Sequence, residues 1–321
     1  MRKGLKIFLI VIVLVVLLWI IISFIPAPKS VKQNKWLEYR NSLNRPLISA
    51  HRGGSELNPE NTEMAFDYIV NNDLADIIEI DVRVTKDNKL VIIHDDSIND
   101  TALDEDEEEV YVRDLTYEEL LNYNFGYNFE SREGLRPYKD ITIEEANSLG
   151  LTIMLLEEFL EKYQDEEIKV LIEIKDNKEL ANYAADEIMK LLNGKYNSWK
   201  EESMIISFTD SVINYISKKY PEQYIGALGY KIIPEIVVQK LGLNALFKAN
   251  YSSIQTKIRR EIGPLTINLG TLNFIKKAHQ RNQTVAYWTI DDVEDMRILI
   301  ENGADIITTD CPDILKQELG I

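Results

Sequence analysis

Cysteine is almost absent from this 321-residue chain, which has one, Cys311. A single cysteine excludes an internal disulfide, so the chain is not a small secreted fold held together by disulfides. The glycine-rich patterns G-x-G-x-x-G and G-x-x-x-x-G-K-[ST] are also missing. Their absence removes the sequence support for a dinucleotide or P-loop site. Histidine is scarce too, with three residues.

Basic residues are outnumbered, with 36 Lys and Arg against 53 Asp and Glu and a net charge of −17. Residues 1–35 hold six basic residues and no acidic one, so the remainder carries −23, six charges more negative than the whole chain. A surface this acidic repels nucleic acid and attracts cations. We therefore expect no nucleic-acid partner.

The segment Ile7–Ile25 has no charged residue, and its one polar residue is Ser23. As a helix it spans ~29 Å, close to the thickness of a hydrocarbon core. A cleaved signal peptide and a buried core helix are the alternatives. The prolines on both sides of Ala27 disfavour cleavage, and the high hydrophobicity disfavours burial in a soluble core.

We therefore expect residues 1–30 to form an uncleaved, single-pass anchor in the cell membrane, followed by a linker over residues 31–45. The basic residues before the apolar segment favour a cytoplasmic N-terminus and an extracytoplasmic catalytic domain. The basic residues after the segment weaken that assignment.

Beyond Pro46, short apolar runs alternate with longer amphipathic stretches. The runs are 48–51, 76–82, 89–94, 169–175, 203–208, 224–230, 252–258, 284–290 and 304–310. Strand–helix alternation at this spacing is typical of a parallel sheet, and about eight such units predict a closed (β/α)8 TIM barrel over residues 46–321. A doubly wound open sheet is the alternative.

Residues 97–150 interrupt this alternation. We expect them to form an insertion in the loop after the second strand. The insertion contains a run of aromatic residues that includes Phe125, Tyr127 and Phe129. These aromatics form either a small satellite core, which is the more common arrangement, or a lid over a substrate.

Two strand-like segments, IIEIDVRV and LIEIK, carry carboxylates at alternate positions. Because alternate residues of a strand share a face, Glu79 and Asp81 point to one side and apolar residues to the other. Glu173 repeats the pattern. Carboxylates that point into a barrel are costly unless a cation or hydrogen-bond donors satisfy them, and hard divalent cations prefer oxygen ligands. The alternative is a pair of internal salt bridges with Arg83 and Lys175.

Two histidines, His51 and His94, stand at the ends of apolar runs next to this acidic cluster. Imidazole is a suitable proton carrier because its pKa lies near working pH. The alternative is that both are satisfied core or surface residues. His279 lies within a helical stretch, and we expect it at the surface. Trp288 stands at a strand end, where it belongs either to the core or to the wall of a site.

Taken together, these residues resemble the glycerophosphodiester phosphodiesterase family over about residues 46–318. The matching motifs are HRG (51–53), PENT (59–62), AF (65–66), E-x-D (79–81), TKDN (85–88), HD (94–95), E-x-K (173–175), WT (288–289) and IITTDCP (306–312). The family has a (β/α)8 barrel whose site lies at the carboxyl ends of the strands, so the resemblance implies the same here.

The resemblance also implies roles for individual residues. One divalent cation, Ca²⁺ or Mg²⁺, would be held by Glu79, Asp81 and Glu173, with Glu60 as a further ligand. His51 and His94 would be the acid/base pair, and Arg52, Lys175 and Trp288 would bind the substrate. The chain departs from the usual family pattern at Asp100, at residues 154–158 and at Asp291. These departures concern the outer pocket and the choice of substrate.

The reaction expected from this resemblance is metal-dependent hydrolysis of a small glycerophosphodiester to an alcohol and glycerol 3-phosphate. A phospholipase D or lyase that acts on lysophospholipids or sphingolipids with the same site is the alternative. A third, less favoured hypothesis is an inactive membrane-anchored binding protein, which the intact set of histidines and carboxylates opposes. Which histidine is the acid stays open at this point.

Overall fold

The computed structural model describes residues 3–104 and 107–321. Arg2, one of the basic residues before the apolar segment, lies outside the described residues, as do Glu105 and Asp106 of the insertion.

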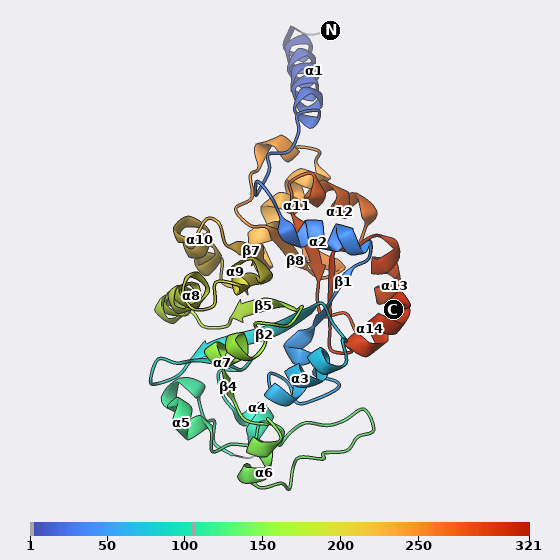
Figure 1. The fold of residues 1–321 in the computed structure, drawn as a ribbon. Coiled ribbons are helices and arrows are strands. Elements are labelled where there is room, and N and C mark those ends of the chain that lie inside the picture. Colours follow the sequence, from blue (N-terminus) through green and yellow to red (C-terminus); the bar gives the residue numbers. More distant parts are fainter. Residues whose placement is uncertain (1–2, 105–106) are drawn as a thin grey trace.

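Within these ranges, eight parallel strands close into a barrel (Figure 1). In order around the barrel they are β1 (Leu47–Ala50), β2 (Ile77–Val84), β5 (Lys169–Ile174), β6 (Ser203–Ser207), β7 (Tyr224–Ala227), β8 (Ser253–Thr256), β11 (Thr284–Tyr287) and β12 (Ile306–Thr309). β1 pairs with both β2 and β12, which closes the barrel. The structure thus confirms the predicted TIM barrel and excludes the open sheet.

Helices surround the barrel because the strands present a second apolar face outward. The longer ones are α3 (Glu63–Asn71), α7 (Leu156–Lys162), α8 (Lys178–Asn193), α10 (Asp210–Lys219), α11 (Ile233–Lys240), α12 (Leu272–His279), α13 (Val293–Glu301) and α14 (Pro312–Leu319). Outward residues of β2 such as Ile78 and Ile80 are fully buried in the core that these helices cover. The opposite face of β2 therefore points into the barrel.

One apolar run, 89–94, is not a barrel strand. It contains β3 (Leu90–Ile92), which pairs antiparallel with the end of β2 and with β4 (Met154–Leu155). These strands and the short helices α4 (Asn99–Ala102), α5 (Tyr117–Leu120) and α6 (Ile143–Ser148) all belong to the connection between β2 and β5. Phe125 is buried in a separate apolar cluster within this connection. The satellite core is therefore present.

The segment expected as a linker contains a helix, α2 (Lys35–Leu43). Asn34 caps it by accepting a hydrogen bond from the backbone N–H of Leu37 at 3.3 Å. The fully buried Trp36 packs in a cluster with Leu47 and Ile77, the first residues of β1 and β2. The stretch is thus packed against the amino-terminal end of the barrel, because burial of the indole holds it there.

The smaller remaining elements are α9 (Trp199–Glu202) and the antiparallel hairpin of β9 (Arg259–Ile262) and β10 (Leu265–Asn268). At the N-terminus, α1 (Lys3–Ser23) projects from the barrel at the end opposite to α4, α5 and α6 (Figure 1). Its segment Gly4–Ser23 is long and apolar enough to cross a membrane, and none of it is buried in the protein.

Candidate active site

The register of the barrel places three carboxylates together. Asp81 of β2 lies directly opposite Glu173 of β5, and Glu79 stands two residues earlier on the same face of β2. Each of the three side chains can offer one carboxylate oxygen such that these atoms lie within 4.8 Å of one another, and all three residues are buried. The carboxylates predicted from the two strand segments thus meet at one point inside the barrel.

A tight turn after β1 positions the first histidine. The residues Arg52, Gly53 and Gly54 have φ of 53°, 83° and 81°, a left-handed conformation that favours glycine. A Cβ atom at Gly53 would lie 2.9 Å from both the Ala65 Cβ and the Phe66 Cδ1, so only glycine fits against α3. The turn directs the backbone N–H of Arg52 to Glu79, at 3.0 Å from Oε2.

Two aspartates beyond the strands hold the His51 ring. His51 Nδ1 lies 2.6 Å from Asp310 Oδ1, just past β12. Asp291 in turn accepts hydrogen bonds from the Asp310 backbone N–H and from the Thr309 hydroxyl, both at 2.9 Å. Burial alone would lower the pKa of His51, but the hydrogen bond to Asp310 and the charge of Glu79 outweigh it and raise the pKa to about 9.

The Arg52 side chain lies across the carboxylate cluster. Its Nη1 donates to Glu60 Oε2 at 2.8 Å, and its Nε lies 3.5 Å from Asp81 Oδ2. Burial raises the pKa of Glu60, while the charge of Arg52 acts in the opposite direction. Glu60, for which the resemblance implies a metal contact, lies outside the three-carboxylate cluster and is bound by Arg52.

Lys175 and Asn61 complete the contacts of the carboxylates. Lys175 Nζ donates to Glu173 at 2.9 Å and lies 3.5 Å from Asp81. Asn61 Nδ2 donates to Asp81 at 3.1 Å, whereas Thr62 caps α3. Arg83 instead bonds the His94 carbonyl at 2.8 Å and lies 3.8 Å from Asp176. Of the two cations in the salt-bridge interpretation, only Lys175 therefore reaches the cluster.

The donor set fits a divalent cation. Burial, together with the charge of Asp81, raises the pKa of both Glu79 and Glu173 from the ordinary value. Three buried carboxylates share one site with two cationic side chains, Lys175 and Arg52, so their full ionisation leaves a negative charge that additional positive charge would neutralise. A hard cation with oxygen ligands, such as Ca²⁺ or Mg²⁺, supplies that charge.

The other two histidines have different surroundings. His94 follows β3, is about one-quarter exposed, and lies with Nδ1 2.8 Å from its neighbour Asp95. His279 ends α12, where its Nε2 lies 2.9 Å from both oxygens of the fully buried Asp305. Asp305 also accepts from the backbone N–H of Val285. His279 is thus half-buried and holds barrel elements together, rather than standing free at the surface as expected.

Trp288 lies on the inner wall. Its ring packs edge-to-face on Phe208, with ring centroids 5.3 Å apart. It borders a cavity of about 20 Å³ that His51, Glu79 and Glu173 also line. A cavity of this size holds about one water molecule. The structure therefore places Trp288 beside the carboxylates, and the two interpretations of this residue, core and wall, are compatible.

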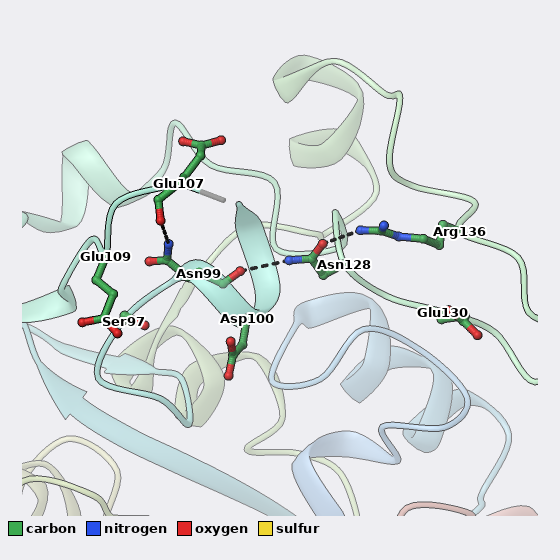
Figure 2. Close-up of a pocket in the computed structure, with 8 residues that line it drawn as sticks. All are labelled: Ser97, Asn99, Asp100, Glu107, Glu109, Asn128, Glu130 and Arg136. Carbon is green, nitrogen blue, oxygen red and sulfur yellow. Dashed lines mark hydrogen bonds between the residues drawn. The ribbon is translucent and has the colours of Figure 1, made fainter. Parts of the chain in front are cut away.

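The insertion forms two polar hollows, and the first of them reaches the site at Glu60. One, of about 270 Å³, is lined by Glu60, Asp100, Phe129 and other residues. The second, of about 460 Å³, is shown in Figure 2, where Asn128 donates to the Asn99 carbonyl at 2.9 Å and Arg136 bonds Asn128. Asp100 lines both hollows, and it shares the first of them with Glu60.

Two residues of the site were not predicted as such. Asn61 and Asp310 both belong to motifs that match the family, but the sequence assigns neither of them a role. Asp310 and His51 are 259 positions apart, and their contact leaves no local pattern in the sequence. The available signal was the position of Asp310 directly after an apolar run, because carboxyl ends of parallel barrel strands meet at one face.

Comparison with known proteins agrees with this geometry. The model of the glycerophosphoryl diester phosphodiesterase family matches residues 51–314. A glycerophosphodiester phosphodiesterase of Caldanaerobacter subterraneus subsp. tengcongensis is 30% identical over 271 residues, covering 84% of this chain and 96% of that protein.

Solved structures share the fold. A glycerophosphodiester phosphodiesterase from Agrobacterium tumefaciens aligns with a TM-score of 0.61 at 21% identity, covering 85% of this chain and 99% of that one. A phosphodiesterase from Oleispira antarctica, solved with its product sn-glycerol-3-phosphate, aligns with a TM-score of 0.64 at 18% identity, covering 88% and 99%. With the family model matching most of its length, this chain belongs to the glycerophosphoryl diester phosphodiesterase family.

Proposed function

We propose that this protein hydrolyses glycerophosphodiesters to an alcohol and glycerol 3-phosphate. The observation that carries the proposal is the convergence of Glu79, Asp81 and Glu173 on the inner faces of β2 and β5, with Arg52 and His51 directly beside them. Family membership and the full-length likeness to glycerophosphodiester phosphodiesterases support it.

Glu79, Asp81 and Glu173 would hold one divalent cation, Ca²⁺ or Mg²⁺. When bound, such an ion polarises phosphoryl oxygens and offsets the charge that develops on them during cleavage. Glu60 acts through Arg52 in this scheme, because its carboxylate fixes the guanidinium that faces the cluster.

Arg52 and Lys175 would bind the phosphate. Both cations are partly exposed and both lie 3.5 Å from Asp81, so a phosphodiester placed over the cluster meets them from two sides. Their fixed positive charge stabilises the additional negative charge of the transition state. Trp288 would form the wall against which the glycerol packs.

The histidines would move the protons. Asp310 binds Nδ1 of His51 and Asp95 binds Nδ1 of His94, which leaves Nε2 of each ring for the substrate. The raised pKa of His51, about 9, keeps this ring protonated at neutral pH, which suits protonation of the departing alcohol. We assign His94 the complementary role, removal of a proton from the nucleophilic water.

We further propose that α1 anchors the protein in the cell membrane by a single pass, with the barrel on the extracytoplasmic side. The support is the apolar segment Gly4–Ser23 and the basic residues before it. The partners would then be small phosphodiesters and the bilayer. Phe125 is buried in its own small core, so this residue adds no support for a lid that binds lysolipids.

Product analysis tests the proposal. Glycerophosphocholine incubated with the full-length protein and a divalent cation should give glycerol 3-phosphate and choline, resolved by phosphorus NMR. A cyclic phosphate as the final product would instead identify a lyase. No turnover of any glycerophosphodiester in a panel of head groups would identify a binding protein and refute the proposal.

A further inference from the structure

An exposed apolar and basic corner of the barrel lies next to the end of α1. We call residues 237–248 the anchor-side corner; it comprises the end of α11 and the turn around Asn244–Leu246. Three of its apolar side chains are exposed: Val237 by 39%, Leu241 by 52% and Leu246 by 63%. None of the three belongs to the buried core of the barrel.

The corner contacts α1 within the apolar segment. Trp19 Nε1 donates to the Leu241 carbonyl at 2.9 Å, and a Cβ atom on Gly242 would lie 3.8 Å from Ser23 Cβ. Trp19 is four residues before the end of the helix, or ~6 Å along its axis. The corner therefore reaches past the end of α1 to the level of a tryptophan, a residue typical of the membrane–water interface.

The corner is held rigidly to the barrel. Arg281 is fully buried and donates to the carbonyls of Phe247 and Asn244 at 2.6 and 2.8 Å. Its Nε lies 3.1 Å from Glu235, which is also fully buried. Lys29, just after α1, donates to Asn282 at 2.9 Å. The anchor and the corner are thus connected to the same part of the barrel.

The charge of the corner is opposite to that of the protein as a whole. The corner contains two basic residues, Lys240 and Lys248, and no acidic one, in a chain of net charge −17. Lys240 and Lys248, on both sides of the turn, are exposed. A negatively charged lipid surface repels the acidic remainder of the protein and attracts this corner, together with the basic residues that follow α1.

We propose that the anchor-side corner lies in the headgroup layer of the bilayer that α1 crosses, with Leu241 and Leu246 inserted and the lysines at anionic lipid. Trp36 and α2 mark the amino-terminal end of the barrel. α1 and the site-bordering insertion lie at opposite ends of the molecule (Figure 1). The mouth of the barrel therefore faces away from the bilayer. On the proposed function, its substrates are water-soluble or polymer-borne phosphodiesters, not lysolipids of the same membrane.

Fluorophore labelling of one introduced cysteine in the full-length protein tests this orientation, because the native Cys311 is buried. The variants Leu246→Cys and Leu135→Cys are a matched pair: both leucines are 63% exposed, and Leu135 lies in the insertion. Each would carry an environment-sensitive fluorophore in vesicles of phosphatidylcholine and phosphatidylglycerol that contain a nitroxide-labelled lipid.

The fluorophore at position 246 should shift to the blue and be quenched at least several-fold more than the one at position 135. Adding Lys240→Glu and Lys248→Glu to Leu246→Cys should reduce the quenching. Equal quenching at both positions, or stronger quenching at 135, overturns the orientation. A protein that fails to float with vesicles refutes the anchor and the corner together. Turnover of glycerophosphocholine by both labelled variants is measured separately and reports on the proposed function alone.

Discussion

Replacing Asp310 by asparagine removes the charge that holds the His51 ring while keeping the size of the side chain. Asp310 lies 2.6 Å from His51 Nδ1 and is itself positioned by Asp291. His51 binds the same carboxylate that accepts from the Ser55 hydroxyl, so an amide oxygen can keep that second bond. The variant therefore changes the electrostatics of one imidazole more than the local fold.

The expected change in the pKa of His51 follows from the strength of its hydrogen bond to Asp310. A hydrogen bond to a charged group contributes ~1.5–3 kcal/mol, and 1.36 kcal/mol corresponds to one unit of pKa. The pKa of His51 should therefore fall from about 9 by roughly 1 to 2 in Asp310→Asn, toward the ordinary value. Turnover should fall ~10- to 10²-fold, less than removal of a general acid would cause.

The direction of the effect on the rate and on stability follows from the protonation state of His51. His51 acts as an acid when protonated, so the wild-type rate should decline as pH rises through the pKa of His51. In Asp310→Asn this decline should begin at lower pH. Because the pKa is raised in the folded state, the His51–Asp310 interaction contributes stability fully below about pH 6.5 and loses it as pH rises through about 9. The variant should therefore be more destabilised at pH 6 than at pH 9.5.

Steady-state rates between pH 5 and 10 and thermal unfolding at both ends of that range measure these effects. Asp313→Asn is the control, since Asp313 pairs with Arg132 on the surface and has no contact with His51 in the structure. A pH profile of Asp310→Asn that overlays the wild-type profile would refute the assignment of His51 as the proton donor.

Two further predictions concern the histidines and the anchor. His51→Ala and His94→Ala should each lower turnover ~10²- to 10⁴-fold, and His51→Ala should also lower the unfolding temperature because it removes the bond to Asp310. His279→Ala should leave turnover nearly unchanged and lower the unfolding temperature, because it breaks the contact with buried Asp305; a large loss of turnover in His279→Ala would contradict the assignment. A protein starting at Val31 should be soluble and cleave glycerophosphocholine at the rate of the full-length protein, since it keeps Asn34 and Trp36 on the barrel. A truncated protein that is monomeric but inactive would contradict this prediction.

The local pattern of β2 was sufficient to predict the acidic cluster. In this strand the apolar and charged residues alternate, and the structure shows Ile78 and Ile80 against the helices and Glu79 and Asp81 inside the barrel. An alternation of this kind could not predict the position of β3 in the sheet. A run such as 89–94 has the composition of a strand, but which strand it pairs with depends on the connection around it, and that connection turns back on β2.

Other features depend on contacts between distant residues. The His51–Asp310 pair joins the first and last barrel strands, and it forms only once the barrel closes. The helix α2 was missed because its one fully buried side chain, Trp36, stands among basic and polar residues, and its packing partners come from strands elsewhere in the chain. Asn34, which caps the helix, was the local signal that could have indicated it.

The most direct test of the account is turnover of glycerophosphocholine in excess chelator, followed by back-titration with Ca²⁺ or Mg²⁺. The three buried carboxylates predict that chelation abolishes glycerol 3-phosphate release and that one of these ions restores it. Asp81→Asn and Glu79→Gln should stay inactive at the ion concentration that restores the wild type. Full activity in excess chelator would contradict the central claim, that Glu79, Asp81 and Glu173 hold a cation on which hydrolysis depends.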